Sequence, residues 1–133
     1  TRYPLVTGVQ TCALPIFADY QPTAGGSVYV HASRMDWQPW RVPGATIKVL
    51  YEDSSKGELT CLLKFPAGTH IPAHEHPALE QTFVLSGQMQ DHDGVATGGD
   101  FILRMPGSKH ENHCPIETIV LAVYRKQNVL YEP

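Results

Sequence analysis

The sequence predicts an all-β protein with one domain. Its 133 residues suffice for one hydrophobic core and are too few for two domains of ordinary size. Eleven Gly and eleven Pro place a turn-forming residue at about every sixth position, which favours many short strands over a few long helices. No segment keeps a helical period for three turns. We therefore expect strands throughout the domain.

Short β-rich runs alternate with turn-forming clusters from Ser27 onward. The runs are SVYVH (27–31), ATIKVLY (45–51), ELTCLLKF (58–65), QTFVLSGQMQD (81–91), DFILR (100–104) and TIVLAVY (118–124). The clusters that bound them are DSSKG, PAG, DHDG, PGS and CP. Runs of this length and spacing are typical of a β-sandwich or barrel.

The run at 58–65 shows the clearest alternation. Its residues Leu59, Cys61, Leu63 and Phe65 share one face of a strand. Cys61 is then expected to be a small buried hydrophobic residue. The three cysteines, Cys12, Cys61 and Cys114, are widely spaced and contain no C-x-x-C, so neither a disulfide framework nor a thiolate zinc site is indicated.

The N-terminal residues depart from this pattern. Residues 6–16, VTGVQTCALPI, resemble the translation of a short-read sequencing adapter, so we expect residues 1–16 to be a non-native segment. Residues 17–26 are expected to be a linker, and residues 27–133 the folded domain. The native N-terminus, and any signal peptide in it, would then be missing, so the sequence leaves localisation undefined.

Charge and hydropathy exclude two classes of partner. The formal net charge is -3, and no surplus of Lys and Arg is present to bind a nucleic acid. No apolar stretch approaches the roughly 20 residues that a membrane helix needs, so a soluble protein is expected.

Histidines and one glutamate form the most informative motif. His74 and His76 are two residues apart, so on a strand their imidazoles point to the same side. Pro77 permits a loop that returns Glu80 to them, and His110 follows a Pro-Gly turn later in the chain. Imidazole and carboxylate ligands together suit Zn, Fe, Mn, Ni or Cu, and do not suit Ca or Mg.

These residues resemble the two motifs of the cupin superfamily. The first motif, G-x5-H-x-H-x3-E-x6-G, is matched in full by Gly68, His74, His76, Glu80 and Gly87. The second, G-x5-P-x-G-x2-H-x3-N, is matched by Gly99, Gly107 and His110. The sequence departs from this second motif at two positions. Met105 occupies the motif's Pro position, with Pro106 one residue later, and Cys114 occupies its Asn position. Between the motifs there is room for one hairpin through residues 91–94.

The resemblance implies a cupin jelly-roll β-barrel, also called a double-stranded β-helix. It also implies one divalent transition metal (Fe, Cu, Mn, Ni or Zn) held by His74, His76, Glu80 and His110. Among cupins, the motifs are similar to the zinc-binding cupin of bacterial anti-sigma factors and to ring- and diketone-cleaving dioxygenases.

Two functions are favoured by this ligand set, and isomerase-type or hydrolytic activity is a further alternative. With four protein ligands, an octahedral ion keeps two open positions, which predicts an oxygen-activating oxidoreductase with Glu80 as a ligand and transient base. This class includes dioxygenases, oxidases and copper-dependent oxidative cleavage of polysaccharides. The same ligands around tetrahedral zinc fill its coordination shell, which predicts a non-catalytic domain that senses a metal or a small molecule.

Several further residues are candidates for the pocket or an interface. Thr82 shares the face of Glu80 by parity, and Trp37 and Trp40 would either form a platform for a small-molecule or carbohydrate substrate or cover a barrel edge or dimer interface. His70 and Cys114 either line the pocket or serve as loop and packing residues. The remaining histidines are expected to be solvated: His31, His92 and His113. Low charge and β-rich termini predict a homodimer.

Overall fold

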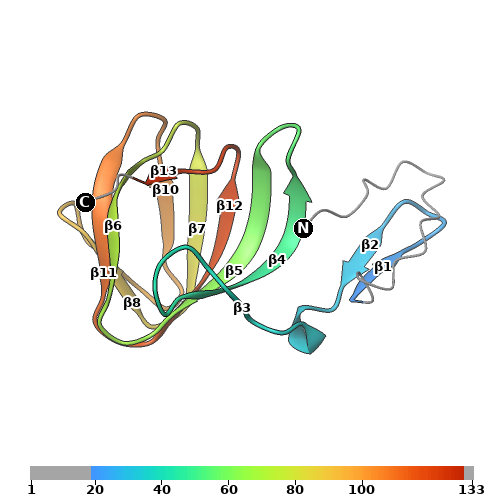
Figure 1. Ribbon diagram of the computed structural model, residues 1–133, viewed down its shortest axis with the longest axis horizontal. Coiled ribbons are helices and arrows are strands. Elements are labelled where there is room, and N and C mark those ends of the chain that lie inside the picture. Colours follow the sequence, from blue (N-terminus) through green and yellow to red (C-terminus); the bar gives the residue numbers. More distant parts are fainter. Residues whose placement is uncertain (1–18, 131–133) are drawn as a thin grey trace.

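Two antiparallel β-sheets face one another and enclose the core (Figure 1). The computed structural model describes residues 19–130 of the chain. The first sheet has the order β10-β7-β12-β5-β4-β3, formed by β3 (Gln38–Pro39), β4 (Thr46–Asp53), β5 (Glu58–Phe65), β7 (Glu80–Ser86), β10 (Phe101–Arg104) and β12 (Thr118–Tyr124). The second has the order β13-β6-β11-β8-β9, formed by β6 (Thr69–Glu75), β8 (Gln88–Gln90), β9 (Val95–Thr97), β11 (Lys109–Cys114) and β13 (Val129–Leu130). The all-β jelly-roll prediction is confirmed.

The chain crosses between the two sheets at Gly87. This glycine lies between β7 and β8, with φ +91, a conformation that side chains disfavour. A Cβ at this position would lie 2.3 Å from the carbonyl oxygen of Glu117, so the crossing has no room for a side chain. The predicted run at 81–91 is therefore two strands in different sheets. The hairpin expected at residues 91–94 is present between β8 and β9, closed by a hydrogen bond from Asp91 N to Gly94 O.

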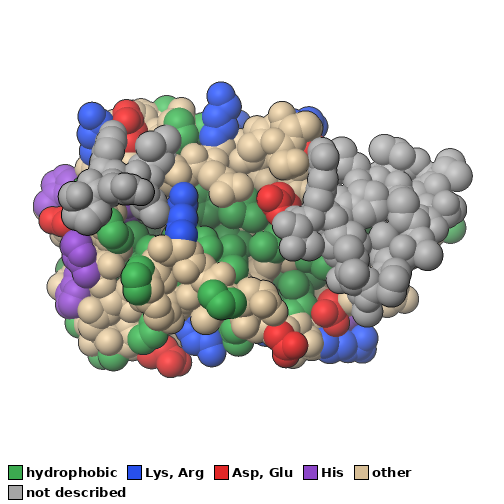
Figure 2. Space-filling model, in the orientation of Figure 1, with side chains coloured by type: hydrophobic (Ala, Val, Ile, Leu, Met, Phe, Trp, Pro, Cys, Tyr) green, Lys and Arg blue, Asp and Glu red, His purple; other side chains and the backbone are tan. Residues whose placement is uncertain are grey.

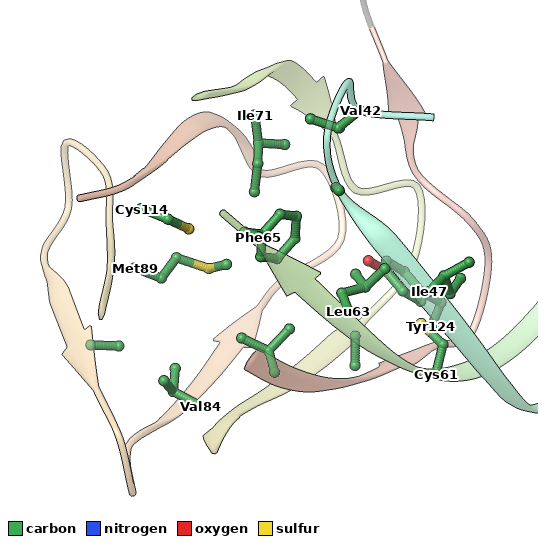
Figure 3. Close-up of a cluster of buried hydrophobic side chains, with 14 of the residues drawn as sticks. Val42, Ile47, Cys61, Leu63, Phe65, Ile71, Val84, Met89, Cys114 and Tyr124 are labelled. Atoms are coloured by element: carbon green, nitrogen blue, oxygen red, sulfur yellow. The ribbon is translucent and has the colours of Figure 1, made fainter. Parts of the chain in front are cut away.

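The core lies between the sheets and is supplied mainly by β5 and β12 (Figure 3). The predicted inward face of β5 is confirmed: Leu59, Cys61, Leu63 and Phe65 are all buried. Opposite residues of β12 complete it, with Val120 paired to Leu63 in the register. The sheets thus share one apolar interior, as two packed layers require.

The segment before the domain differs from the linker that we expected. Tyr20–Pro22 forms β1, which pairs with β2 (Val28–Val30) in a separate two-stranded sheet. A turn between Thr23 and Gly26 closes this hairpin, because Gly26 adopts φ +88. The Tyr20 hydroxyl donates a hydrogen bond to the carbonyl oxygen of Val49 and so links the hairpin to β4. Residues 1–16, predicted to be non-native, lie outside the described residues.

Helical structure is minor within residues 19–130. It consists of one short 3-10 helix, η2 (Ala32–Arg34), which follows β2. None of the helices in this range has the length and apolar character needed to cross a membrane.

Candidate metal centre

Three histidines meet at one end of the space between the sheets. His74 lies on β6 and His110 on β11, where the two residues are direct cross-strand partners. His76 follows the end of β6, and its backbone N–H donates a hydrogen bond to the carbonyl oxygen of Ser108, the residue before β11. All three side chains are buried. Neither β6 nor β11 was among the β-rich runs of the sequence, because histidine and proline interrupt their apolar patterns.

The ring nitrogens of the three histidines converge. One nitrogen from each of His74, His76 and His110 lies within 4.8 Å of the others. The Nε2 atoms of His76 and His110 are 2.7 Å apart. The structure thus brings together three of the four predicted ligands.

Two of the rings are oriented by partners at Nδ1. His74 Nδ1 is 2.8 Å from the Pro72 carbonyl oxygen, and His110 Nδ1 is 2.9 Å from Asp91 Oδ2. Because both partners accept hydrogen bonds, each Nδ1 carries the proton and each Nε2 keeps its lone pair. Arg104 Nη1 lies 2.6 Å from the same Asp91 oxygen and fixes that carboxylate in turn.

Glu80, the fourth predicted ligand, lies beside His76 at the start of β7. Its Oε2 atom is 2.9 Å from His76 Nδ1, a close ionic contact that lacks hydrogen-bond alignment. Thr82 Oγ1 donates to Glu80 Oε1 at 2.7 Å, and Asn128 Nδ2 donates to Oε2 at 2.8 Å. Glu80 is therefore held next to the three histidines but outside the set of converging ligand atoms.

Burial and neighbouring charges set the protonation states of these groups. Burial lowers the pKa of His74, and burial together with Arg104 lowers the pKa of His110 to about 4. Burial would raise the pKa of Asp91, but hydrogen bonds from His110 and the Asp93 N–H, with Arg104, lower it to about 2. Burial likewise opposes ionisation of Glu80, but the nearby His76 and hydrogen bonds from Asn128 and Thr82 lower its pKa.

This donor set fits a divalent transition metal. Metal binding requires neutral imidazoles and ionised carboxylates, and the pKa shifts of His74, His110 and Glu80 favour those states. With its Nδ1 proton directed at Asp91, His110 Nε2 has a free lone pair 2.7 Å from His76 Nε2, so these two nitrogens are close enough to bind the same ion. The residues that would hold the ion are His74, His76 and His110.

A small interior cavity adjoins the cluster. It has a volume of about 20 Å³, which is room for about one water molecule. Its walls combine an apolar floor that includes Phe65 and Val120 with polar groups from several elements. These polar lining residues are Arg41, His74, Glu80, Thr82, Arg104, Asn112, Tyr124 and Asn128.

Of the residues predicted to contact substrate, two line this cavity. Thr82 lies beside Glu80 as its parity predicted, and Trp40 packs edge-on against Phe65 at the cavity wall. Trp37 does not line it, and its ring instead contacts the ammonium groups of Lys48 and Lys64. The two tryptophans therefore do not form one platform.

Other expectations are settled by burial. Cys114 is fully buried in the core and does not line the cavity. His70 lies on the outer face of β6, with its side chain 57% exposed. Sequence reasoning missed Asp91 and Asn128, which contact His110 and Glu80 from 19 and 48 residues away. No local signal marks either residue, because each contact arises from the fold.

The jelly-roll fold and the buried histidine cluster together define a cupin with a candidate metal site. The chain belongs to the family of ChrR cupin-like domains, whose family model matches residues 25–129. None of the curated proteins compared with the sequence is similar to it.

Solved structures support the same fold. A proposed acetylacetone dioxygenase from Methylibium petroleiphilum PM1 aligns with a TM-score of 0.73 at 21% identity, over 79% of this chain and 81% of that one. An acetylacetone dioxygenase from Acinetobacter johnsonii has a TM-score of 0.65 at 16% identity, over 99% and 82% of the two chains. The complex of Rhodobacter sphaeroides SigE with the anti-sigma ChrR gives 0.61 at 25% identity, over 68% of this chain and 50% of that chain.

Proposed function

We propose that the protein is a metal-dependent, oxygen-activating oxidoreductase of the dioxygenase or oxidase type. The observation that carries this proposal is a cluster of three buried imidazoles, one of which, His74, lines a cavity that also has other polar groups. Three protein nitrogens would leave coordination positions on a bound ion open to water, O2 or a substrate. The chemistry supplied by a bound Fe, Cu, Mn or Ni ion is Lewis acidity and electron exchange with O2.

The residues around the cluster have separate tasks in this proposal. Asp91 and the Pro72 carbonyl hold the rings of His110 and His74, so that each Nε2 atom faces inward. Glu80 serves as a fourth ligand, or as the base that takes a proton from the substrate. Its ionised state is maintained by donors from Thr82 and Asn128.

The cavity, with room for about one water molecule, is too small for a polysaccharide but offers polar groups to a small ligand. Burial raises the pKa of Tyr124 well above 10, so its hydroxyl remains a proton donor at the cavity wall. Asn128 Oδ1 is buried and has no hydrogen-bond partner, which suits recognition of a substrate O–H or N–H group. Because Trp37 lies elsewhere, the surface needed to bind an extended carbohydrate is not present among these residues.

A second candidate function is a non-catalytic domain that senses a metal or a small molecule. It is favoured by membership of the ChrR cupin-like family and by the 25% identity to the chain of the anti-sigma complex. In that case Glu80 completes a four-coordinate zinc site with the three histidines.

One experiment separates the two functions. Protein purified without chelators or added metal is analysed for its metal, and oxygen uptake is then measured against a panel of small enolisable and aromatic substrates. Oxygen consumption that disappears in His76→Ala supports the oxidoreductase. Tightly held zinc, with no ligand exchange with azide and no turnover, supports the sensor.

We also propose that the protein forms a homodimer. β10 is the edge strand of the six-stranded sheet, and its outward residues Phe101 and Leu103 are 52% and 54% exposed. An unpaired edge flanked by exposed apolar side chains favours pairing with a second copy. Light scattering at tens of micromolar tests this, and a monomer there would contradict it.

A further inference from the structure

The β6–β11 ladder carries a second pair of histidines on its outer face. His113 on β11 is the cross-strand partner of His70 on β6, just as His110 is the partner of His74. Side chains of β11 alternate in burial, with His110 and Cys114 inside and Glu111 exposed. The same two strands therefore present one histidine pair to the interior and another to solvent.

The outer pair already has a carboxylate neighbour. His70 Nε2 lies 2.9 Å from Glu111 Oε2, and the two side chains are 57% and 63% exposed. Directly opposed residues of an antiparallel ladder have Cβ atoms about 4.5–5.5 Å apart. Since metal–imidazole bonds are about 2.0–2.1 Å long, two rings at that spacing can reach one ion.

A surface groove surrounds these side chains. Its volume is about 340 Å³, and His70, Glu111 and His113 line it together with Gln90 and His92. Figure 2 shows histidine side chains gathered at the end of the molecule where Figure 1 places β6, β11 and β8. Two imidazoles and a carboxylate in an open groove are a donor set for copper, nickel or zinc.

We propose that His70, His113 and Glu111 form a second, solvent-accessible site for a divalent transition metal on the outer face of the β6–β11 ladder. Their ligand atoms are less closely gathered than those of the inner cluster, so binding turns the exposed His70 and Glu111 side chains toward the half-buried His113 and one ion. This rotation does not disturb the core. The site is separate from the proposed oxidoreductase function and does not depend on it.

Retention on immobilised Ni²⁺ tests the outer site selectively. Tag-free protein carrying its purified metal is applied to the resin, and the imidazole concentration at elution is compared among wild type, His70→Ala, His113→Ala, His92→Ala and His31→Ala. The inner histidines are buried and cannot reach a resin-bound ion. His31 is the matched control, because its ring contacts Gln21 far from the groove. We expect His70→Ala and His113→Ala to elute early, and His31→Ala to elute with wild type.

Calorimetric titration with Ni²⁺ gives the affinity in solution. Two imidazoles held on a rigid ladder bind one ion together, so loss of either one should weaken this binding at least about tenfold. The metal content retained from purification should not change. His113→Gln serves as a second variant if circular dichroism shows that His113→Ala does not fold.

Two results would overturn the proposal. The first is equal retention and equal Ni²⁺ affinity in wild type, His70→Ala and His113→Ala. The second is loss of retention in His92→Ala alone, which would place the site in the hairpin beside Asp93, 3.3 Å from His92.

Discussion

The inner and outer histidine pairs of the β6–β11 ladder differ in their surroundings, and a register shift lies between them. His74 with His110, and His70 with His113, are each direct cross-strand partners. The inner pair is buried, and both of its rings are fixed at Nδ1 by Pro72 O and Asp91. In the outer pair, His70 contacts the exposed carboxylate of Glu111.

This difference shows that one pair of strands can place histidines in two kinds of site, one buried with fixed rings and one open to solvent. Burial lowers the pKa of the inner histidines and keeps them neutral, and their partners remove rotational freedom. An ion therefore meets preorganised ligands inside and must order mobile ligands outside. The inner site should bind tightly and exchange slowly, and the outer site should bind weakly and exchange quickly.

The largest expected effect is on metal content, and it should distinguish the inner pair from the outer pair when one histidine of each is replaced on β11. His110→Ala should abolish the stoichiometric metal found after purification, as should His74→Ala and His76→Ala, because each removes one of three converging nitrogens. Glu80→Gln should weaken binding less, since an amide oxygen remains in place. His113→Ala, three residues along β11, should retain the metal. Elemental analysis measures all five proteins, and full occupancy in His110→Ala would contradict the inner site.

The second effect is slow alkylation of the two cysteines in the core, which measures how far solvent reaches the interior between the sheets. Burial raises the pKa of Cys61 to about 12 and that of Cys114 to about 11. At pH 8 both thiols stay protonated, so alkylation should be at least about a hundredfold slower than for a free cysteine. Iodoacetamide labelling followed by peptide mass mapping measures each site by itself. Fast labelling of the native protein at Cys114, with no increase in denaturant, would show that the interior is open.

The third effect tests the ring partner of His110. Asp91→Asn removes the charge that accepts from His110 Nδ1, which should lower metal affinity about 10–100-fold. Asp93→Asn is the matched control, because Asp93 belongs to the same hairpin but its side chain is 75% exposed. Competition with a chromophoric chelator gives both affinities. Equal affinities in the two variants would remove Asp91 from the site.

Much of the fold followed from local pattern. The alternation in ELTCLLKF correctly predicted the buried face of β5, because a strand between two layers repeats its environment every two residues. The pattern failed at Gly87, where one apolar run spans a crossing between sheets, and at residues 20–22, where a short polar segment pairs with β2. In both places the outcome depends on contacts between distant segments.

The candidate site was predicted only in part, because some of its contacts also join segments that are distant in the sequence. The spacing of His74 and His76, with His110 after a Pro-Gly turn, led to the three residues that converge. Asp91 and Asn128 were not predicted, because their contacts with His110 and Glu80 exist only after the sheets have formed. Trp37 and Trp40 are close in sequence but lie in different surroundings, which spacing alone does not reveal.

The last comparison concerns the free energy of unfolding and two carboxylates that lie at the same distance from a histidine. Glu80 Oε2 is 2.9 Å from His76 Nδ1, and Glu111 Oε2 is 2.9 Å from His70 Nε2. Glu111→Ala should change the free energy of unfolding by less than about 0.5 kcal/mol, since solvent screens an exposed pair and the side chains lose entropy on pairing. Glu80→Ala leaves the donors of Thr82 and Asn128 buried without an acceptor, which should cost about 2–4 kcal/mol. Urea unfolding of the metal-free proteins measures both changes. Equal losses would mean that solvent screens the Glu80 and Glu111 contacts to the same extent. The contrast between the inner and outer pairs would then have to come from the histidines alone.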